Sequence, residues 1–221
     1  MRHLPAVRAV LLLAAVLSPV VASARVPLTL RLGYAGQVST AHAYDLVDEN
    51  DHLPLFRVGA GYSFLLPTGR LEVEGGFLTG GTSAPLHQVT TARLGLVGVE
   101  AGAAYRVRVG TSFEPYAQVL VGHDWLKLEL AALNQRTGQL SATALLGVSL
   151  LIPTRQGDAA SSAFVVDLGV GYGFRPDARF DALAPTPPEN AEEEPIRSAP
   201  LPVGSLPLSG VTYRLQVGLR L

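Results

Sequence analysis

The 221-residue sequence contains no cysteine, a single tryptophan and only 16% charged residues. Without cysteine, the chain has neither a disulfide framework nor the residue to which a lipoprotein anchor is attached. Beyond residue 24, no apolar stretch approaches the 18 residues that indicate a transmembrane helix. That part carries 15 basic and 18 acidic residues, a net charge of −3, which is not the clustered basic surface of a nucleic-acid-binding protein. The high content of hydrophobic residues (48%) and the 23 glycines are therefore not explained by membrane helices and need another structural explanation.

The first 24 residues have the three parts of a secretory signal peptide. Arg2 and Arg8 supply a positive start, residues 9–17 are apolar, and Ala22 and Ala24 are the small residues of a cleavage site. Nine apolar residues are fewer than the roughly 20 that a membrane-spanning helix needs, which disfavours an uncleaved anchor. We therefore predict export, cleavage after about Ala24 and one mature domain over residues 25–221.

Apolar and polar residues alternate over most of the mature chain, which is the period of a β-strand. Eight stretches show this pattern, at about 27–37, 55–66, 70–79, 91–109, 114–130, 138–152, 163–175 and 210–221. One face of each stretch carries large apolar residues, and the other carries glycine, small residues and charges. Small residues suit the narrow interior of a closed barrel, so the apolar faces are expected to meet lipid. Arg93 falls on an apolar face, which is compatible with a β-bulge there.

The connections differ in length in the manner of an outer-membrane barrel, which has long loops outside and short turns in the periplasm. Residues 67–69 form a tight turn, whereas residues 38–54 and 176–208 are long. The short connection at 131–137 suggests that the two strands beside it project beyond the membrane. The stretch 176–208 contains eight prolines and six acidic residues, so we predict a mobile loop. A linker between domains is the alternative, but only one strand follows it.

No stretch has the pattern of a Gly-rich phosphate loop, an HExxH site or a GxSxG site. The predicted loops contain an acidic cluster with oxygen ligands that suit loosely held Ca²⁺, but its spacing matches no EF-hand loop and solvated charge is the simpler interpretation. It consists of His42, Asp45, Asp48, Glu49, Asp51 and His52. In lipid A deacylases a His and a Ser lie two positions apart on one strand, whereas Trp125 stands two positions after His123 here. We therefore predict no catalytic residue, no cofactor and no metal site.

Two sets of side chains are predicted to matter in the barrel. Charges inside a narrow barrel must pair, because a lone buried ion costs several kcal/mol. The predicted interior charges are Arg31, Arg57, Glu72, Glu74, Glu100, Asp124, Asp167, Arg214 and Arg220. Amphipathic rings are predicted to form a belt at the membrane surface. The belt candidates are Tyr34, Tyr62, Tyr105, Trp125, Tyr172 and Tyr213. Arg106 and Arg108 are expected at the exposed periplasmic rim.

The signal peptide, the alternating strands and the apolar final strand together resemble the small OmpA-type and OmpX-type outer-membrane barrels. The stretches FEPYAQVLVGHDW (113–125) and VVDLGVGYGF (165–174) are similar to strands of that group. The resemblance implies an eight-stranded antiparallel up-and-down barrel, localisation in the outer membrane, and contact with its lipid and lipopolysaccharide. It also implies assembly by the barrel-assembly machinery, and we expect a monomer. The final residue departs from the pattern, because Leu221 stands where these families usually have Phe.

We predict an integral outer-membrane barrel with a plugged polar interior and no enzymatic activity, which acts in envelope structure or in surface interaction through its long loops. One alternative is a lipid A-modifying enzyme that uses a serine and His123. Another is a soluble periplasmic barrel that binds an apolar ligand, as lipocalins do, and a third is a small pore. The direction of Val166, Leu168 and Val170 tests the membrane assignment, because it is wrong if these side chains point into the barrel.

Overall fold

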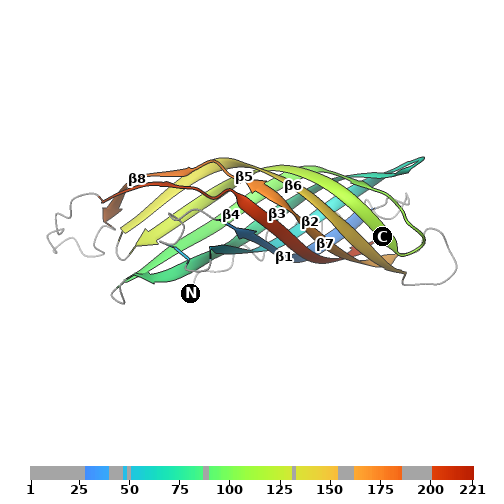
Figure 1. Ribbon diagram of the computed structural model, residues 1–221, viewed down its shortest axis with the longest axis horizontal. Coiled ribbons are helices and arrows are strands. Elements are labelled where there is room, and N and C mark those ends of the chain that lie inside the picture. The colour runs from blue at the N-terminus through green and yellow to red at the C-terminus, as the bar shows by residue number, and fades with distance from the viewer. Residues whose placement is uncertain are drawn as a thin grey trace, which may run out of the picture.

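The computed structural model describes residues 28–39, 47–48, 51–86, 90–130, 133–153, 162–185 and 201–221, and in this part the chain is built from β-strands (Figure 1). The strands are β1 (Leu28–Val38), β2 (His52–Leu66), β3 (Gly69–Leu86), β4 (Thr90–Arg106), β5 (Phe113–Leu130), β6 (Leu133–Pro153), β7 (Ala163–Phe174), β8 (Ala178–Pro185), β9 (Leu201–Leu206) and β10 (Gly210–Arg220). Among these residues no helix has the length and apolar character needed to cross a bilayer. The predicted signal peptide and its cleavage site lie outside the described residues.

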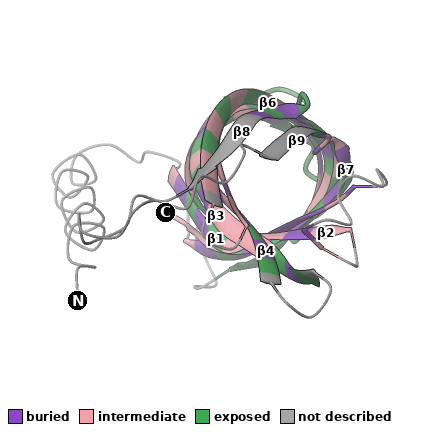
Figure 2. Cartoon of the chain, turned by 90° about the vertical axis from the view of Figure 1, so that its left-hand side faces the viewer, coloured by how far each residue is buried: buried purple, intermediate pink, exposed green. Residues whose placement is uncertain are grey.

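Eight strands close into a ring, which Figure 2 shows from one end. Each strand from β1 to β7 pairs antiparallel with the next, and β10 pairs with both β7 and β1. The contact between β1 and β10 leaves no open edge in the closed part of the barrel, so every strand there has two neighbours. The predicted eight-stranded antiparallel barrel is therefore confirmed, and its final strand pairs with its first.

The large apolar side chains point outward. Leu168 is 44% exposed and Val170 is 57% exposed, whereas Asp167 beside them is 2% exposed. A closed barrel whose outer surface is covered by Leu, Val and Phe is suited to lipid, and its polar residues are left to line the interior. This orientation contradicts the lipocalin-like alternative, in which the large apolar residues point inward.

The strands differ in length, and the difference lies at one end of the barrel. β1 and β10 have 11 residues each, which cover about 28 Å at the usual tilt and match a bilayer core of about 30 Å. β3, β4, β5 and β6 have 17–21 residues. Residues 133–141 of β6 continue past the last residue that pairs with β7. We call this end the hairpin end and the opposite end, where β1 begins and β10 ends, the terminus end.

A hairpin of β8 and β9 stands at the hairpin end, within the stretch 176–208 that was predicted to be a loop. Its strands pair from Ala178↔Leu206 to Leu183↔Leu201, and two residues of β8 also pair with the start of β6. The side chains of Phe180 and Leu206 are buried, so apolar packing accompanies the pairing. The strongly acidic residues 186–200 lie outside the described residues.

The strands also extend beyond the limits predicted from alternation. β2 begins at His52 rather than Leu55, β3 continues to Leu86 rather than Thr79, and β6 begins at Leu133 rather than Gly138. β4 keeps one unbroken register with β3 and with β5 through Arg93, so the strand has no bulge there. The presence of Arg93 on a face that is otherwise apolar therefore has a cause other than a bulge.

Candidate functional site: the barrel interior and its outer rim

The structure places all nine predicted interior charges on the inner face of the barrel. Eight of them are buried, and Arg220 at the terminus end is half-buried. Alternation along each strand puts them there, because the neighbouring residues in the sequence are the outward apolar ones. The charges come from seven different strands, so their partners are set by closure of the ring.

Two arginines bridge carboxylates in the middle of the interior. Arg31 Nε lies 2.5 Å from Asp167 Oδ2, and its Nη1 atom contacts Glu72 and lies 3.6 Å from Glu74 Oε2. Arg57 Nη2 lies 2.7 Å from Glu74 Oε1, while its Nε donates to Glu100. Glu74 thus joins the two arginines into one network. The rigid guanidinium fork allows one side chain to bridge two or three carboxylates in this way.

Arg214 extends the network across the barrel from β10. Its Nη1 and Nη2 atoms donate to the two oxygens of Glu100 at 3.0 and 2.8 Å, a bidentate pair. Such pairs are among the strongest hydrogen-bonded contacts in proteins. Glu100 therefore serves two arginines, and each loses a partner if this carboxylate is removed.

Arg106 belongs to the network, and its predicted position at the exposed rim was wrong. It is 1% exposed, with Nε 3.2 Å from Glu72 Oε2, Nη1 3.3 Å from Asp167 Oδ1 and its guanidinium 4.5 Å from the centre of the Tyr116 ring. The signal was available, because Arg106 shares the polar face of β4 with Glu100. Arg108, two residues later, is exposed.

Three further buried charges, Arg70, Glu114 and Arg175, were also not predicted. Arg175 Nε donates to Asp124 Oδ2 at 2.7 Å, and Arg70 and Arg220 meet Glu114 Oε2 at 2.8 and 3.1 Å. Arg70 and Glu114 lie at strand ends, where the alternation is too short to show a face. With these, the interior network of the described residues contains seven arginines and six carboxylates.

The interior becomes apolar toward the hairpin end. A cluster of buried apolar side chains lies there, and we call it the mouth core. It consists of Ala35, Val47, Leu53, Leu55, Leu78, Ala92, Leu94, Leu96, Leu126, Leu128, Ala178, Phe180, Leu206 and Leu208, with Leu130 packed against it. Alternation along the sequence predicts a polar interior along the whole barrel, and it gives no sign of this cluster.

At the level where the interior becomes apolar, the outer face changes from apolar to charged. On β5 the last large apolar residue that points outward is Trp125, and Lys127 and Glu129 follow on the same face. On β4 the outward Val97 gives way to Gly95 and Arg93. Arg93 therefore marks an inversion of the pattern: inside the membrane the apolar face points out, and beyond it the apolar face points in.

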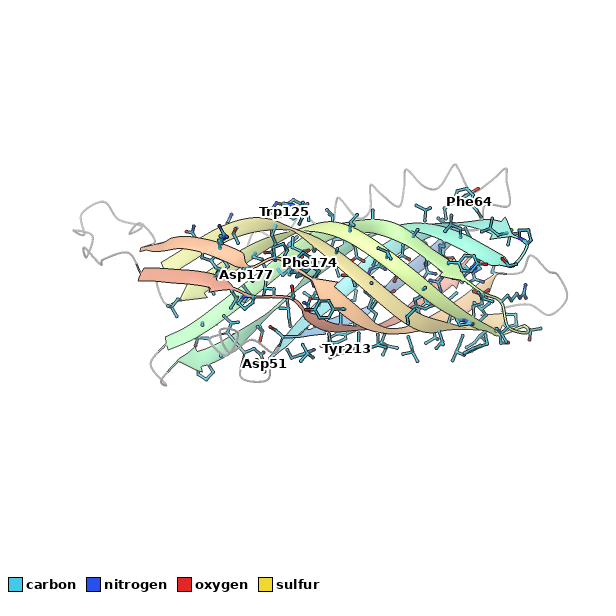
Figure 3. The ribbon with its side chains drawn as sticks, turned by 45° about the horizontal axis from the view of Figure 1, so that its top comes forward. Asp51, Phe64, Trp125, Phe174, Asp177 and Tyr213 are labelled. Atoms are coloured by element: carbon cyan, nitrogen blue, oxygen red, sulfur yellow. The ribbon has the colours of Figure 1, made fainter. Side chains whose placement is uncertain are left out.

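The belt candidates are placed near the two ends of the lipid-facing band. Tyr34 and Tyr213 flank His52, whose Nε2 atom lies 2.9 and 2.7 Å from their hydroxyl oxygens. Tyr105 meets Thr68 in the β2–β3 turn, with 2.7 Å between their hydroxyl oxygens. Figure 3 shows Trp125 and Tyr213 near the middle of the molecule and Phe64 toward the terminus end. The remaining candidates, Tyr62 and Tyr172, are exposed on the outer face.

His123 does not combine with its sequence neighbour Asp124. Its ring packs edge-on against Trp125 with 4.8 Å between the ring centres, whereas Asp124 points inward to Arg175. The two side chains thus lie on opposite faces of β5. In the predicted acidic cluster, Asp48 Oδ1 accepts a hydrogen bond from the backbone N–H of His52 at 3.2 Å, while His42, Asp45 and Glu49 lie outside the described residues. Within the described ranges no group of three His, Cys, Asp or Glu side chains is arranged to hold a metal ion.

The chain is similar to a known protein family and to several solved structures. Residues 9–184 match the family model for the outer membrane protein beta-barrel domain. No curated protein matches the chain. Similar solved structures include Ail, the attachment invasion locus protein of Yersinia pestis, in complex with the heparin analogue sucrose octasulfate. That match has 15% identity and a TM-score of 0.49, and it covers 89% of this chain and 99% of Ail.

Two further solved structures have similar coverage. Neisserial surface protein A has 13% identity and a TM-score of 0.45, with 90% of this chain and 97% of that chain covered. The N-terminal barrel of Pseudomonas aeruginosa OprF has 12% identity and a TM-score of 0.38, with coverages of 88% and 98%. The family model spans most of the 221 residues. The chain therefore belongs to the outer membrane protein beta-barrel domain family and is a protein of the outer membrane.

Proposed function

We propose that this protein is a closed, non-enzymatic barrel that holds its hairpin end at the cell surface for interaction with the surroundings of the cell. The observation that supports the proposal is that two sets of buried side chains point into the interior, and we infer that both fill it. The arginine–carboxylate network occupies the part of the barrel inside the membrane, and the mouth core occupies the part beyond it.

The two fillings block passage by different means. Ions that enter from the terminus end meet arginines and carboxylates that are largely paired with one another, so they have few free groups to bind. Water and ions that enter from the hairpin end meet buried Leu, Val and Phe side chains, which offer no hydrogen bonds. An eight-stranded barrel is also narrow enough for side chains to fill. We infer that the barrel conducts neither ions nor solutes.

The orientation follows from the lengths of the strands and connections. The longest connections and the β8–β9 hairpin lie at the hairpin end, whereas Pro67 and Thr68 alone join β2 to β3 at the terminus end. Outer-membrane barrels have long loops outside and short turns in the periplasm. The hairpin end is therefore assigned to the cell exterior, where its polar outer face meets water and lipopolysaccharide. We further propose that the protein is a monomer and reaches the membrane through the barrel-assembly machinery.

Recordings in planar bilayers test the closed interior. The purified full-length protein is expected to give no steady conductance steps, while a porin inserted into the same bilayer shows that channels are detectable. Regular steps from this protein would contradict the closed interior.

Surface labelling tests the orientation separately. An epitope inserted after residue 190 is expected to bind antibody on intact cells, whereas one inserted after residue 158 should bind only after the outer membrane is permeabilised. The reverse pattern would overturn the assignment of the hairpin end to the exterior.

A further inference from the structure

A shallow groove of about 380 Å³ lies on the outer face of the barrel, beyond the lipid-facing band. It is lined by Gly81, Thr82, Ser83, Arg93, Leu94, Gly95, Lys127 and Glu129. Its floor follows from the register. Gly81 pairs with Gly95, and Gly95 pairs in turn with Lys127, so two adjacent positions of the outer face lack side chains.

The groove lies directly next to the last apolar row of the outer face. That row consists of Val97 and Trp125, which pair with each other, and both are exposed. One step further toward the hairpin end, the outward positions are Gly95 and Lys127. Tryptophan marks the interface between the acyl chains and the headgroups. The groove is therefore at the level of the lipid headgroups.

The charge around the groove is positive. Arg93 and Lys127 line it, and Arg136 pairs with Lys127 from the neighbouring strand, while Glu129 is the one carboxylate among the residues that line it. Lys127 contacts Glu129, but in the described part of the chain no carboxylate lies within 4.0 Å of Arg93 or Arg136. The hydrogen bond from Lys127 and the nearby arginines lower the pKa of Glu129, which lies beyond the membrane, so it stays ionised and the cluster has a net charge of +2.

We propose that this groove binds the phosphate group of an outer-leaflet glycolipid, with lipid A as the source of that phosphate. Arg93 presents paired N–H donors that match phosphate oxygens, and Lys127 adds a mobile positive charge. The glycine floor leaves room for the sugar that bears the phosphate. The proposal rests on the proposed function in one respect, since it requires that the hairpin end face the outer leaflet.

The residues of the groove allow two independent ways to disrupt it. Arg93→Gln combined with Lys127→Gln removes charge but keeps the size of the side chains. Gly95→Leu keeps every charge and fills the floor. A Cβ atom at Gly95 meets only the backbone oxygen of Lys127, at an ordinary 3.9 Å, so the backbone accepts the change. Arg108→Gln is the matched control, because it removes an exposed charge at the opposite end.

The test is a titration of the purified full-length protein in detergent, followed by native mass spectrometry. The probes are bisphosphorylated lipid A, the same lipid without phosphates, and inorganic phosphate. We expect phosphorylated lipid A to bind about tenfold more tightly than the dephosphorylated lipid, the value of one good charge-assisted contact. The double charge variant should lose this preference, Gly95→Leu should weaken binding, and Arg108→Gln should behave like the wild type. A heat-dependent shift in unboiled gels confirms that each variant is folded.

Three outcomes would overturn the proposal. Equal affinities of the wild type and the double charge variant would exclude the groove, and equal losses in the Arg108→Gln control would indicate a general charge effect. Displacement of the lipid by millimolar inorganic phosphate would identify the free anion, rather than the lipid, as the ligand. The titration is done in detergent and does not depend on orientation, so its failure is distinct from a failure of the epitope and conductance experiments.

Discussion

The two halves of this barrel differ in which face of the strands is apolar and which is charged. Inside the membrane, arginines and carboxylates line the interior and the outer face is apolar. Beyond the membrane, the mouth core lines the interior and the outer face carries Arg93, Lys127 and Glu129. The backbone pairing is continuous through both halves. The surrounding medium, lipid or water, therefore decides which face of a strand is apolar.

The largest expected effect breaks the polar half. Glu100→Gln leaves the buried Arg57 and Arg214 with less negative charge, and removing one partner of a buried ion pair costs about 3–5 kcal/mol. The matched control is Glu129→Gln, at an exposed pair beyond the membrane, where the expected loss is about 1 kcal/mol or less. Urea-induced unfolding of each variant in lipid vesicles gives the free energy of unfolding. Similar losses of unfolding free energy in the two variants would contradict the prediction that a buried ion pair costs more to break than an exposed one.

A smaller effect is expected from the apolar half. Leu96→Ala removes a fully buried side chain from the mouth core and should lower the free energy of unfolding by about 2–4 kcal/mol. Thr91→Ala, on the exposed face of the same strand, should change it by about 0.5 kcal/mol or less. The same urea titration measures both. An unchanged stability for Leu96→Ala would mean that the mouth core does not hold the hairpin end together.

The smallest effect concerns the boundary between the halves and requires no substitution. Trp125 is the only tryptophan, and it is half-exposed on the outer face at the inversion of the pattern. Its fluorescence should be quenched more strongly by lipids labelled near the headgroup than by lipids labelled at the ends of the acyl chains. Stronger quenching from the centre of the bilayer would move the boundary and place the groove inside the acyl region.

Much of the barrel could be predicted from alternation, which is a local property. The strand at 163–175 repeats large apolar and small polar residues without interruption, and β7 occupies nearly the same span. The prediction failed where the alternation changed phase, because a short polar stretch such as that around Arg93 resembles either a bulge or a turn. It also failed for Arg106, since an arginine near a strand end is equally typical of an exposed rim.

The β8–β9 hairpin illustrates a second kind of limit. Proline and acidic residues dominate the composition of 176–208, and an average over that stretch hides the apolar Phe180 and Leu206 at its two flanks. Those side chains become buried only because the mouth of the barrel provides an apolar surface below them. No local pattern reports the existence of that surface.

The sequence by itself determined the eight strands of the ring, the alternation of their faces within the membrane and the family, because a period of two is visible in neighbouring residues. The tertiary structure alone decided which charges meet. Arg31 reaches Asp167 across 136 residues of sequence, and Arg214 reaches Glu100 across 114. These contacts exist because β10 pairs with β1 and closes the ring, and closure fixes the register of every strand against its neighbours. The inversion at the rim was likewise decided in three dimensions, where the barrel leaves lipid and enters water.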